Sequence, residues 1–455
     1  MSRTLKLGGS LATLVLVLAA CAGPVASPTP AASGTPGQAT GTPGQASGTP
    51  AQATGTPGAS ASAVPTITPV PTAPPATVAC AGGGTGGTLT GELTLWHSYG
   101  SGAGTEVDAL NQGLALVCAE NPGLKVNVVG LDFNSLFNVY QAQAADGDPD
   151  LFIAPNDSMW QLAEVPVIQN VKDQLDTSKF LQLAIDGSSY TTTTSEAGIW
   201  QVPESLKAVA LYFNKDKVAT APATTADLLT AVQGGAKLGL LGGTNIYHNF
   251  GWWGAFGGQL MDDSGKCIAD QGGVADSMQF LADLQTAGAT FYPAYADMAA
   301  DFKAGSLDMI VDGPWAAGGY VESIANLGIA PMPAGPAGPA LPLTGVDGYN
   351  INPYADTPDL AVAFAQRMVQ ADVEAIYANV AYHIPATADV PPSDNAISAE
   401  FAAAVQNGYL RPQRVELNNF WGNFGNALSQ VLDEGVDPTT AVADACSAMN
   451  STNGL

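Results

Sequence analysis

The side chains in this sequence that could do chemistry are mostly carboxylates and aromatic rings. The 455 residues include 40 Asp and Glu, seven Trp and 13 Tyr, but only three histidines, at positions 97, 248 and 383. None of these histidines stands in a HExxH or similar metal-binding pattern, and neither a Gly-x-Ser-x-Gly elbow nor a Walker loop occurs. The sequence therefore offers no motif for a zinc hydrolase, a serine hydrolase or a P-loop nucleotidase, and we expect no metal and no cofactor.

Carboxylates in pairs could still hydrolyse a glycosidic bond. With 40 acidic residues, however, the sequence does not single out such a pair, and most of these acids are expected to be solvated surface groups. The glycine-rich stretch GGGTGG at 82–87 precedes the first expected strand, whereas a phosphate-binding loop follows one. We interpret it as the end of a linker. Binding is therefore a better first hypothesis than bond-breaking.

Polar and aromatic residues follow several strand-like runs. The run LDMIVDGPW passes from a buried-strand pattern directly into Asp312 and Trp315, and two earlier runs end at residues 96–99 and 155–157. In open α/β sheets, ligands bind at the carboxyl ends of the strands. These strand ends are the places where a binding site is expected.

The elements that must position these residues alternate between strand and helix. A strand is expected within GELTLWHSYG (91–100), a helix over 105–120, and further strands at 125–131 and within 148–157. This order and spacing is typical of a parallel α/β sheet.

Two later helix starts carry a capping residue followed by proline. Thr357 precedes Pro358, and Asp437 precedes Pro438, which suits the first position of a helix. In the second helix Cys446 shares one face with neighbouring apolar residues.

The composition excludes some partners. The formal net charge is −26, which repels phosphate backbones and disfavours nucleic acid as a partner. At 46% hydrophobic residues the chain has enough apolar side chains for a large core or two domains.

The first residues have the features of a secretion signal. In 1–20 a short basic region precedes an apolar run that is too short to span a membrane as a mature helix. The segment LAAC ends at Cys21 and matches a bacterial lipobox, although an ordinary signal peptide with an incidental cysteine is an alternative. Residues 21–88 are rich in Gly, Thr, Pro, Ala and Ser, repeat GTPGQAT-like units, and are expected to form a disordered tether. We expect a lipid-anchored protein on the outer face of the cell membrane.

The remainder of the chain resembles a known family. The landmarks, in chain order, are WHSYG, GDPDLFIAPND, LYFNKDKV, GGQLMDDSGKC, FKAGSLDMIVDGPW, GVDGYNINPYADTPDLAVAFAQRMV and ELNNFWGNFGNAL. They cover residues 89–450 and are similar to those of the bacterial extracellular solute-binding lipoproteins that serve ABC sugar importers. The phrases RPQRVELNNFWGNFGNAL and GVDGYNINPYA resemble the maltose and maltodextrin branch of this family.

This resemblance implies an α/β, two-lobed, periplasmic-binding-protein-like (type II) fold with a ligand cleft between lobes joined by a hinge. The hinge would lie near residues 203–206 and 345–349. The segments implied for the N-terminal lobe are 89–205 and 349–395, and those for the C-terminal lobe are 206–348 and 396–455.

A sugar ring offers an apolar face, which packs on flat aromatic rings, and an edge of hydroxyls, which bind charged or amide groups. The ligand contacts that the resemblance and the strand ends imply are Ser98, Ser101, Asp157, Tyr247, Trp252, Tyr295, Asp312, Trp315, Asp347, Tyr349 and Trp421. Trp315 and Trp421 match stacking positions of maltodextrin binders, and two core tryptophans are the alternative.

Other positions keep two interpretations. Of the adjacent Trp252 and Trp253, one is expected in the core. Asp312 could cap the following helix instead of contacting ligand, and Asp347 and Tyr349 could shape the hinge. The sequence departs from the family pattern at Ala154, where relatives often carry Trp, and near Lys207, where they carry an acid. The exact sugar and its length are therefore not implied.

Four cysteines remain once Cys21 is lipidated, an even number that suits two disulfides in an oxidising compartment. The resemblance implies the pairs Cys80–Cys118 and Cys267–Cys446.

The resemblance also implies a monomer that captures a carbohydrate such as maltose or a maltooligosaccharide and delivers it to a membrane permease. A sensory or adhesive carbohydrate-binding lipoprotein and a glycoside hydrolase are the alternatives.

Overall fold

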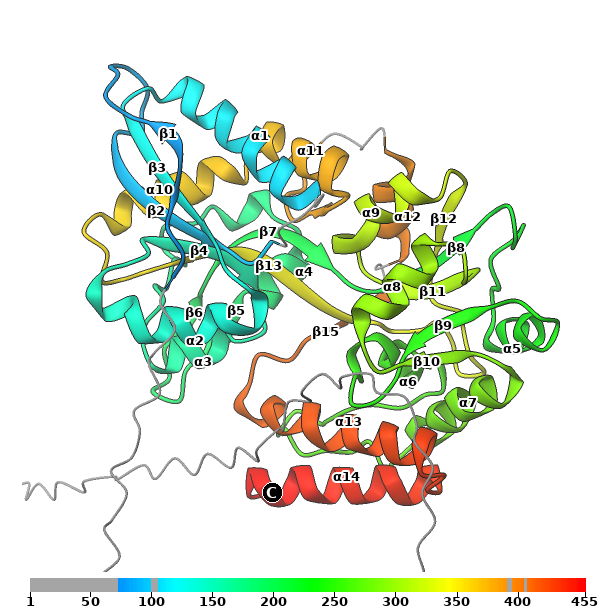
Figure 1. Ribbon diagram of the computed structural model, residues 1–455. Coiled ribbons are helices and arrows are strands. Elements are labelled where there is room, and N and C mark those ends of the chain that lie inside the picture. The colour runs from blue at the N-terminus through cyan, green and yellow to red at the C-terminus, as the bar shows by residue number, and fades with distance from the viewer. Residues whose placement is uncertain (1–72, 100–104, 391–394, 405–406) are drawn as a thin grey trace, which may run out of the picture. The chain divides into compact units, whose positions relative to one another are not determined.

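The computed structural model describes residues 73–99, 105–390, 395–404 and 407–455 of the chain (Figure 1). The expected signal peptide, the lipidated Cys21, the repeats of the tether and Ser101 lie outside these residues. Within the described ranges, no helix has both the length and the apolar character needed to cross a membrane.

A large mixed sheet organises the first part of the chain. Its strands, in spatial order, are β1 (Thr77–Ala81), β3 (Leu124–Gly130), β2 (Gly91–His97), β4 (Leu151–Pro155), β13 (Leu343–Ile351), β7 (Val202–Lys207) and β14 (Ile384–Pro385), with β15 (Tyr409–Leu410) paired to β13. Strand β2 runs parallel to β3 and β4, as expected for an α/β sheet. Strand β13 is antiparallel to both β4 and β7.

A second, five-stranded sheet organises the middle of the chain. Its strands, in spatial order, are β10 (Thr290–Tyr292), β9 (Leu238–Leu241), β11 (Met309–Asp312), β8 (Ala210–Asn214) and β12 (Leu327–Ala330). A separate hairpin is formed by β5 (Ser189–Thr191) and β6 (Ala197–Ile199). Strand β7 of the large sheet leads into β8 of the second sheet, so the chain crosses from one sheet to the other at this point.

Helices cover both sheets (Figure 1). Those of the large sheet are α1 (Thr105–Glu120), α2 (Phe133–Gln143), α3 (Met159–Glu164), α4 (Gln182–Gly187), α10 (Pro358–Met368) and α11 (Ala371–Ile376). The helices in the part of the molecule that contains the second sheet are α5 (Thr225–Gln233), α6 (Gly251–Ala255), α7 (Val274–Ala287), α8 (Tyr295–Lys303), α9 (Ala317–Ser323), α12 (Ala396–Ala404), α13 (Asn418–Asp433) and α14 (Pro438–Asn453). Short helical turns include η3 (Tyr247–Asn249), η4 (Pro314–Ala316), η5 (Tyr377–Ala381) and η7 (Val415–Leu417).

The two expected helix starts differ in their caps. Helix α14 begins at Pro438, and the Asp437 carboxylate accepts a hydrogen bond of 3.1 Å from the Thr440 N–H, as a helix cap does. Helix α10 begins at Pro358, but the side chain of Thr357 makes no capping hydrogen bond. Proline therefore marks both starts, and only Asp437 caps.

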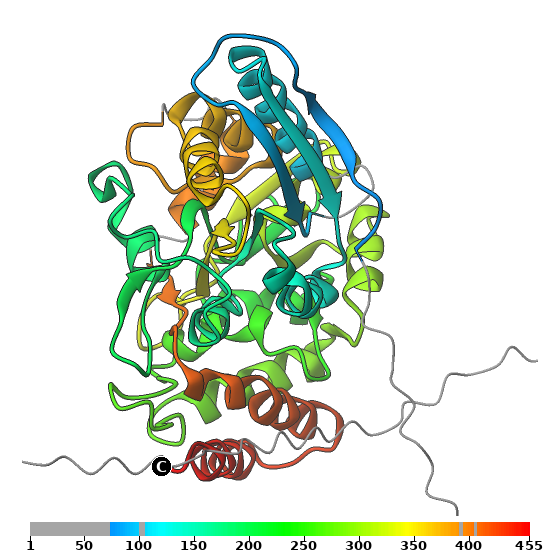
Figure 2. The ribbon, with the colours of Figure 1, turned by 90° about the vertical axis from the view of Figure 1, so that its left-hand side faces the viewer.

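The folded part begins earlier than expected, which corrects the tether boundary at residue 88. Residues 77–81 form β1, which pairs antiparallel with β3 at the edge of the large sheet (Figure 2). The Asn121 side chain then accepts hydrogen bonds from the backbone N–H groups of Thr88 and Leu89. The sequence TVACA hides this strand because only Cys80 in it is buried, so no alternation of apolar residues marks it.

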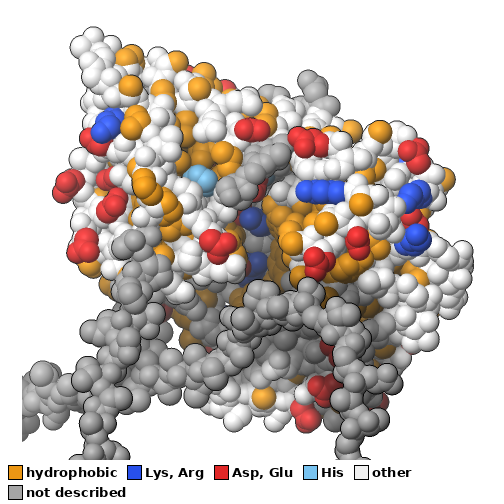
Figure 3. Space-filling model, in the orientation of Figure 1, with side chains coloured by type: hydrophobic (Ala, Val, Ile, Leu, Met, Phe, Trp, Pro, Cys, Tyr) orange, Lys and Arg blue, Asp and Glu red, His pale blue; other side chains and the backbone are white. Residues whose placement is uncertain are grey.

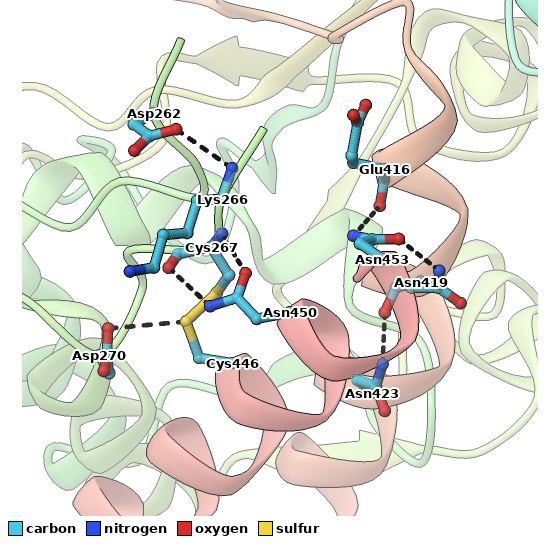
Figure 4. The surroundings of a disulfide bond; sticks show 10 residues. All are labelled: Asp262, Lys266, Cys267, Asp270, Glu416, Asn419, Asn423, Cys446, Asn450 and Asn453. Atoms are coloured by element: carbon cyan, nitrogen blue, oxygen red, sulfur yellow. Dashed lines mark hydrogen bonds between the residues drawn. A yellow bond between two sulfur atoms is a disulfide. The ribbon is translucent and has the colours of Figure 1, made fainter. Parts of the chain in front are cut away.

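Two disulfides join Cys80 to Cys118 and Cys267 to Cys446, the pairs that the resemblance implied. The first ties β1 to helix α1. The second ties helix α14 to the loop after α6, where the Asn450 side chain also bonds both the N–H (2.7 Å) and the C=O (3.2 Å) of Cys267 (Figure 4). Helix α14 packs on α13, so this loop, α14 and α13 form one connected block.

The pairing of β13 with β7 contains a bulge at the point where the chain crosses between the sheets. Asp347 pairs with Ser205 while Gly348 pairs with Pro203, so Glu204 is an extra residue without a partner in the ladder. Proline has no N–H to donate, and a bulge is one of the few places in a sheet that tolerate it. Bulges also re-aim side chains and are frequent near functional sites.

Candidate functional site

Side chains from both sheets and from the crossing strands meet in one region. They are Asp157 after β4, Lys207 at the end of β7, Tyr247 of η3, Trp315 of η4, Asp347 of β13, Arg411 after β15 and Trp421 of α13. Figure 3 shows a hollow on one face of the molecule, with Lys or Arg side chains (blue) inside it and hydrophobic side chains (orange) along one wall. A concave site that combines aromatic walls with a few charged groups has the usual character of a small-molecule site.

Aromatic rings and two cations alternate in this region. The Trp315 and Tyr247 ring centroids are 6.1 Å apart with a 40° angle between the rings. The Arg411 guanidinium carbon lies 5.6 Å from the Tyr247 centroid and 5.7 Å from the Trp421 centroid. Lys207 Nζ lies 5.5 Å from the Trp315 centroid. Each cation is therefore within the range of a cation–π contact, and we call Trp315, Tyr247, Arg411 and Trp421 the aromatic row.

Each cation also has one carboxylate partner. Lys207 Nζ lies 2.6 Å from Asp347 Oδ2, and Arg411 forms an ion pair with Asp157. Burial raises the pKa of Asp347 to about 6, although the Lys207 ammonium opposes this shift. Burial alone would lower the pKa values of Lys207 and Arg411, but the neighbouring carboxylates outweigh it and raise both. Both cations therefore stay charged at neutral pH.

Three buried polar atoms here have neither a hydrogen-bond nor an ion-pair partner among the described residues. They are Asp347 Oδ1, the Tyr247 hydroxyl and Arg411 Nε. Buried polar groups are nearly always hydrogen-bonded, so atoms without a partner require an explanation. An acceptor, a hydroxyl and a donor side by side could bind a ligand that carries several hydroxyl groups.

Trp315 is positioned by the end of β11. Strand β11 ends at Asp312, and Pro314 opens the turn that carries the half-buried Trp315 ring. A Cβ atom on Gly313 would lie 2.1 Å from this ring, so the ring packs directly on the glycine backbone. The Tyr212 hydroxyl donates a 2.7 Å hydrogen bond to the Gly313 carbonyl and fixes the turn. The residue types of DGPW thus determine where the ring lies.

Family and structural comparisons agree with this architecture. A model of the bacterial extracellular solute-binding protein family matches residues 114–407. The chain belongs to this family. The solute-binding protein is 25% identical over 355 residues to a maltooligosaccharide ABC transporter solute-binding lipoprotein of Streptococcus pneumoniae, covering 71% of this chain and 79% of the relative. It is 27% identical over 257 residues to a maltodextrin-binding protein of Bacillus subtilis, covering 50% and 58% of the two chains.

Solved structures resemble it over most of its length. A maltotriose-binding protein of Thermus thermophilus, bound with maltotriose, has a TM-score of 0.70 and 26% identity, covering 80% of this chain and 100% of that one. The GacH receptor of Streptomyces glaucescens has a TM-score of 0.72 and 24% identity, covering 80% and 98%. These likenesses confirm the fold class expected from the sequence.

Asp312 of the solute-binding protein is not placed as a ligand contact or a helix cap, which corrects both expectations. It is fully buried, and it accepts hydrogen bonds from the Gly313 N–H (2.8 Å), the Tyr320 hydroxyl (2.6 Å) and the Tyr295 hydroxyl (3.1 Å). His248 Nε2 lies 3.6 Å from Asp312 Oδ1, the oxygen that accepts from the Gly313 N–H. Asp312 therefore holds Tyr295, a residue that remains 38% exposed.

Two expected contacts are core residues instead. Trp252 is 0% exposed and packs edge-on against Phe280, and Trp253 is buried as well, against Phe424. Helix α6 is enclosed by its neighbours, so both adjacent tryptophans of the solute-binding protein point into apolar surroundings. Tyr349 is also 0% exposed and packs in the core of the large sheet, where β13 lies between β4 and β7.

Of the remaining expected contacts, Ser98 is half-buried directly after β2, at the carboxyl end of the parallel strands. Ser101 falls outside the described residues. Asp157, Tyr247, Trp315, Asp347 and Trp421 are the expected residues that the fold of the solute-binding protein brings together.

Sequence reasoning missed Arg411 and a buried histidine cluster. His383 Nδ1 lies 2.9 Å from Glu204 Oε1, and His383 Nε2 lies 3.2 Å from Glu106 Oε1. Burial would lower the pKa of His383, but the two carboxylates outweigh it and raise that pKa to about 10. The scarcity of cations was an available signal for Arg411, because the chain has only 14 Lys and Arg residues.

Two further observations concern the surroundings of this site. A pocket of about 840 Å³ lies between the β5–β6 hairpin and residues 413–416, and none of the expected ligand contacts lines it. In the described part of the chain, no group of three or more His, Cys, Asp or Glu side chains is arranged to hold a metal ion.

Proposed function

We propose that this protein is the substrate-binding component of an ABC importer and that it captures a carbohydrate, best represented by a maltooligosaccharide. The observation that carries the proposal is the aromatic row with its two ion pairs, formed where strands cross between the two sheets of a solute-binding protein. Relatives named for maltooligosaccharides and maltodextrin support the choice of sugar.

In this proposal the first lobe comprises residues 77–205 and 349–395, and the second comprises 206–348 and 396–455. The ligand contacts both lobes only when the cleft is closed. Its binding energy therefore shifts the hinge equilibrium toward the closed state, which a membrane permease can recognise.

The proposed roles follow from the surroundings of each side chain. Trp315, Trp421 and Tyr247 cover the apolar faces of sugar rings, with Tyr295 at the edge of the site. Asp157 and Asp347 accept hydrogen bonds from sugar hydroxyls. Ser98 can donate to the ligand from the loop after β2. Binding without hydrolysis is the proposed activity.

Anchoring is the second part of the proposal. Cys21 would carry the lipid that holds the monomeric protein on the outer face of the cell membrane. Replacing Cys21 with Ser should move the protein from the membrane fraction to the medium or periplasm, as measured by fractionation and immunoblotting. Retention in the membrane fraction would contradict this part.

The test of binding is a thermal-shift panel followed by calorimetry. The probes are glucose, maltose, maltotriose, a neutral peptide and spermidine. Maltotriose at a hundred times its dissociation constant should stabilise the protein by about 2.7 kcal/mol. A stabilising effect of the peptide or of spermidine, with none from any sugar, contradicts the proposal. Release of reducing ends from maltotriose would point to a hydrolase instead.

A further inference from the structure

We propose that Arg411 is a specificity-determining residue of the cleft and that, together with Asp157, it recognises the neighbouring hydroxyl groups of an uncharged glycosyl unit. This inference rests on the proposed function, because it names the chemical group of the ligand that the same cleft would bind. Arg411 opens the landmark RPQRVELNNFWGNFGNAL, but the sequence did not single it out as a ligand contact, and its surroundings in the fold carry the argument.

Arg411 is held rigidly although it has no position in regular secondary structure. Its backbone N–H donates a 2.9 Å hydrogen bond to the Thr344 carbonyl, directly after β15 has paired with β13. Its guanidinium carbon lies 3.7 Å from the place where a Cβ atom on Gly345 would be, so the group passes close over the crossing strand. The residue as a whole is only 3% exposed. A side chain fixed this way is preorganised for binding.

Two aromatic faces border the guanidinium. Tyr247 comes from η3 and Trp421 comes from α13, and both centroids lie within 6 Å of the guanidinium carbon (5.6 and 5.7 Å). Planar Arg stacks well on aromatic rings, whereas a compact ammonium would leave these faces less covered. Arg411 is therefore part of the surface against which a sugar ring at Trp421 would pack.

The hydrogen-bonding capacity of the pair is only partly used. Arg411 Nε is buried without an acceptor among the described residues. The Asp157 side chain is 30% exposed, so its carboxylate keeps surface for a further donor. A donor next to an acceptor matches two adjacent hydroxyl groups, of which one accepts from the guanidinium and the other donates to the carboxylate.

The charges favour a neutral ligand over an anionic one. Arg411 is neutralised by Asp157, and Lys207 is neutralised by Asp347, so both cations that the structure describes in the aromatic row and beside it are paired. Glu106 adds a carboxylate close enough to act on the charge of Lys207. A carboxylated sugar would have to compete with these acids for the two cations. The two ion pairs thus select against uronic acid units.

Calorimetry with maltotriose on three variants tests the inference. Arg411→Met keeps the apolar stem between the two rings and removes the donors. Arg411→Lys keeps a charge for Asp157 and removes the planar fork. Arg414→Met is the matched control, because Arg414 is three residues away and pairs with Glu416 at 2.8 Å. We expect affinity to fall at least tenfold for Arg411→Met, less for Arg411→Lys, and by no more than twofold for Arg414→Met.

A second arm uses the carboxylate and an anionic probe. Asp157→Asn should weaken maltotriose binding, and its effect should not add to that of Arg411→Met in the double variant, because the two residues read the hydroxyls as a unit. Digalacturonate should bind the wild-type protein at least tenfold more weakly than maltotriose. If Arg411→Met does not fold, Arg411→Lys and Asp157→Asn decide the question.

The outcomes separate this inference from the proposed function. Unchanged maltotriose affinity in both Arg411 variants, with wild-type binding intact, refutes the inference alone. Tighter binding of digalacturonate than of maltotriose refutes it as well. Absence of wild-type binding to every sugar refutes the proposed function and this inference together. The melting temperature of ligand-free Arg411→Met is the last readout. A large fall in this temperature, with a loss of affinity that Arg411→Lys does not share, would assign Arg411 a structural role.

Discussion

Trp315 illustrates how a single residue is prepared for binding. The ring packs on Gly313 and next to Tyr247, yet it is only half-buried, so its removal leaves little empty volume. We predict that Trp315→Ala weakens maltotriose binding at least tenfold, measured by calorimetry, with little change in melting temperature. The matched variant Trp253→Ala removes a core ring and should destabilise the fold by about 3–5 kcal/mol. Equal maltotriose affinity in the wild-type protein and in Trp315→Ala would show that Trp315 has only a packing role.

Asp347 provides a prediction about pH. Its pKa of about 6 lies above the ordinary value of 3.8 because the carboxylate is buried, and it faces Lys207, His383 and Glu204. A sugar hydroxyl that donates to Asp347 Oδ1 favours the ionised form, so maltotriose affinity should fall as pH decreases through 6. The free energy of unfolding should instead increase as pH decreases from 6 to 4. The reason is that the folded state binds the Asp347 proton more tightly than the unfolded state does in this range.

The measurement is the maltotriose dissociation constant and the melting temperature in a pH series from 4.5 to 8, with Asp347→Asn as the control. The control should lose the step in affinity near pH 6. A step of the same size in the control would assign the titration to another group.

Individual residues show where sequence reasoning succeeds and where it ends. Trp315 and Trp421 could be singled out because both follow recognisable landmarks. The resemblance and the strand ends implied Trp252, Tyr349 and Asp312. Their surroundings are decided instead by packing against α7, by the interior of the large sheet and by two tyrosine hydroxyls. Arg411 pairs with Asp157 from a distant part of the chain, and no local pattern encodes such a pair.

At the scale of elements, the crossing strands are held by the His383 cluster. His383 lies between the bulge residue Glu204 and Glu106 at the start of α1. A histidine whose pKa is raised to about 10 contributes stability that is complete below its ordinary pKa of 6.5 and is lost as pH rises toward 10. The melting temperature of the wild-type protein should therefore fall between pH 7 and 10. His383→Gln should be less stable at pH 7 and should lack this part of the pH dependence.

The block of α13, α14 and the loop at Cys267 positions Trp421. We predict that the double variant Cys267→Ala, Cys446→Ala lowers the free energy of unfolding by about 2–5 kcal/mol, measured by denaturant titration. It should also weaken maltotriose binding, because Trp421 loses its support. The double variant Cys80→Ala, Cys118→Ala is the control: it removes a bridge far from α13 and should leave binding at neutral pH unchanged.

Helices and strands with strong apolar periodicity were predictable from the sequence, and short strands that only pair with the side of another strand were not. The helix expected at 105–120 and the strands around 91–97 and 124–130 form with nearly the expected bounds, because apolar periodicity and helix-start residues act locally. Strand β1 has only one buried residue and β15 is only two residues long, so neither produces such a pattern. Each exists because a neighbouring strand edge, β3 or β13, offers hydrogen bonds.

At the scale of the whole molecule, the proposed function requires movement at the crossing strands. The Gln161 side chain on α3 donates a 2.7 Å hydrogen bond to that of Asn418 on α13, so these two residues join the proposed lobes. The test is a Gln161→Cys, Asn418→Cys variant in a Cys21→Ser background, with the two new cysteines joined by a short bifunctional maleimide. We predict that the crosslinked protein binds maltotriose at least tenfold more slowly, as measured by stopped-flow tryptophan fluorescence. The same variant without the crosslinker is the control, and equal rates in both would argue against a hinge.

The disulfide between Cys80 and Cys118 also has a mechanical consequence. Any pull on the chain ahead of Thr77 enters the fold at β1, at the outer edge of the large sheet. The covalent bond passes this force to α1 before it can separate the rest of β1 from β3. Strands β7 and β13, at which the chain crosses between the sheets, do not pair with β1. Tension on the N-terminal chain therefore loads the outer edge of the large sheet first, and one route from there to β7 runs through α1, whose Glu106 bonds His383.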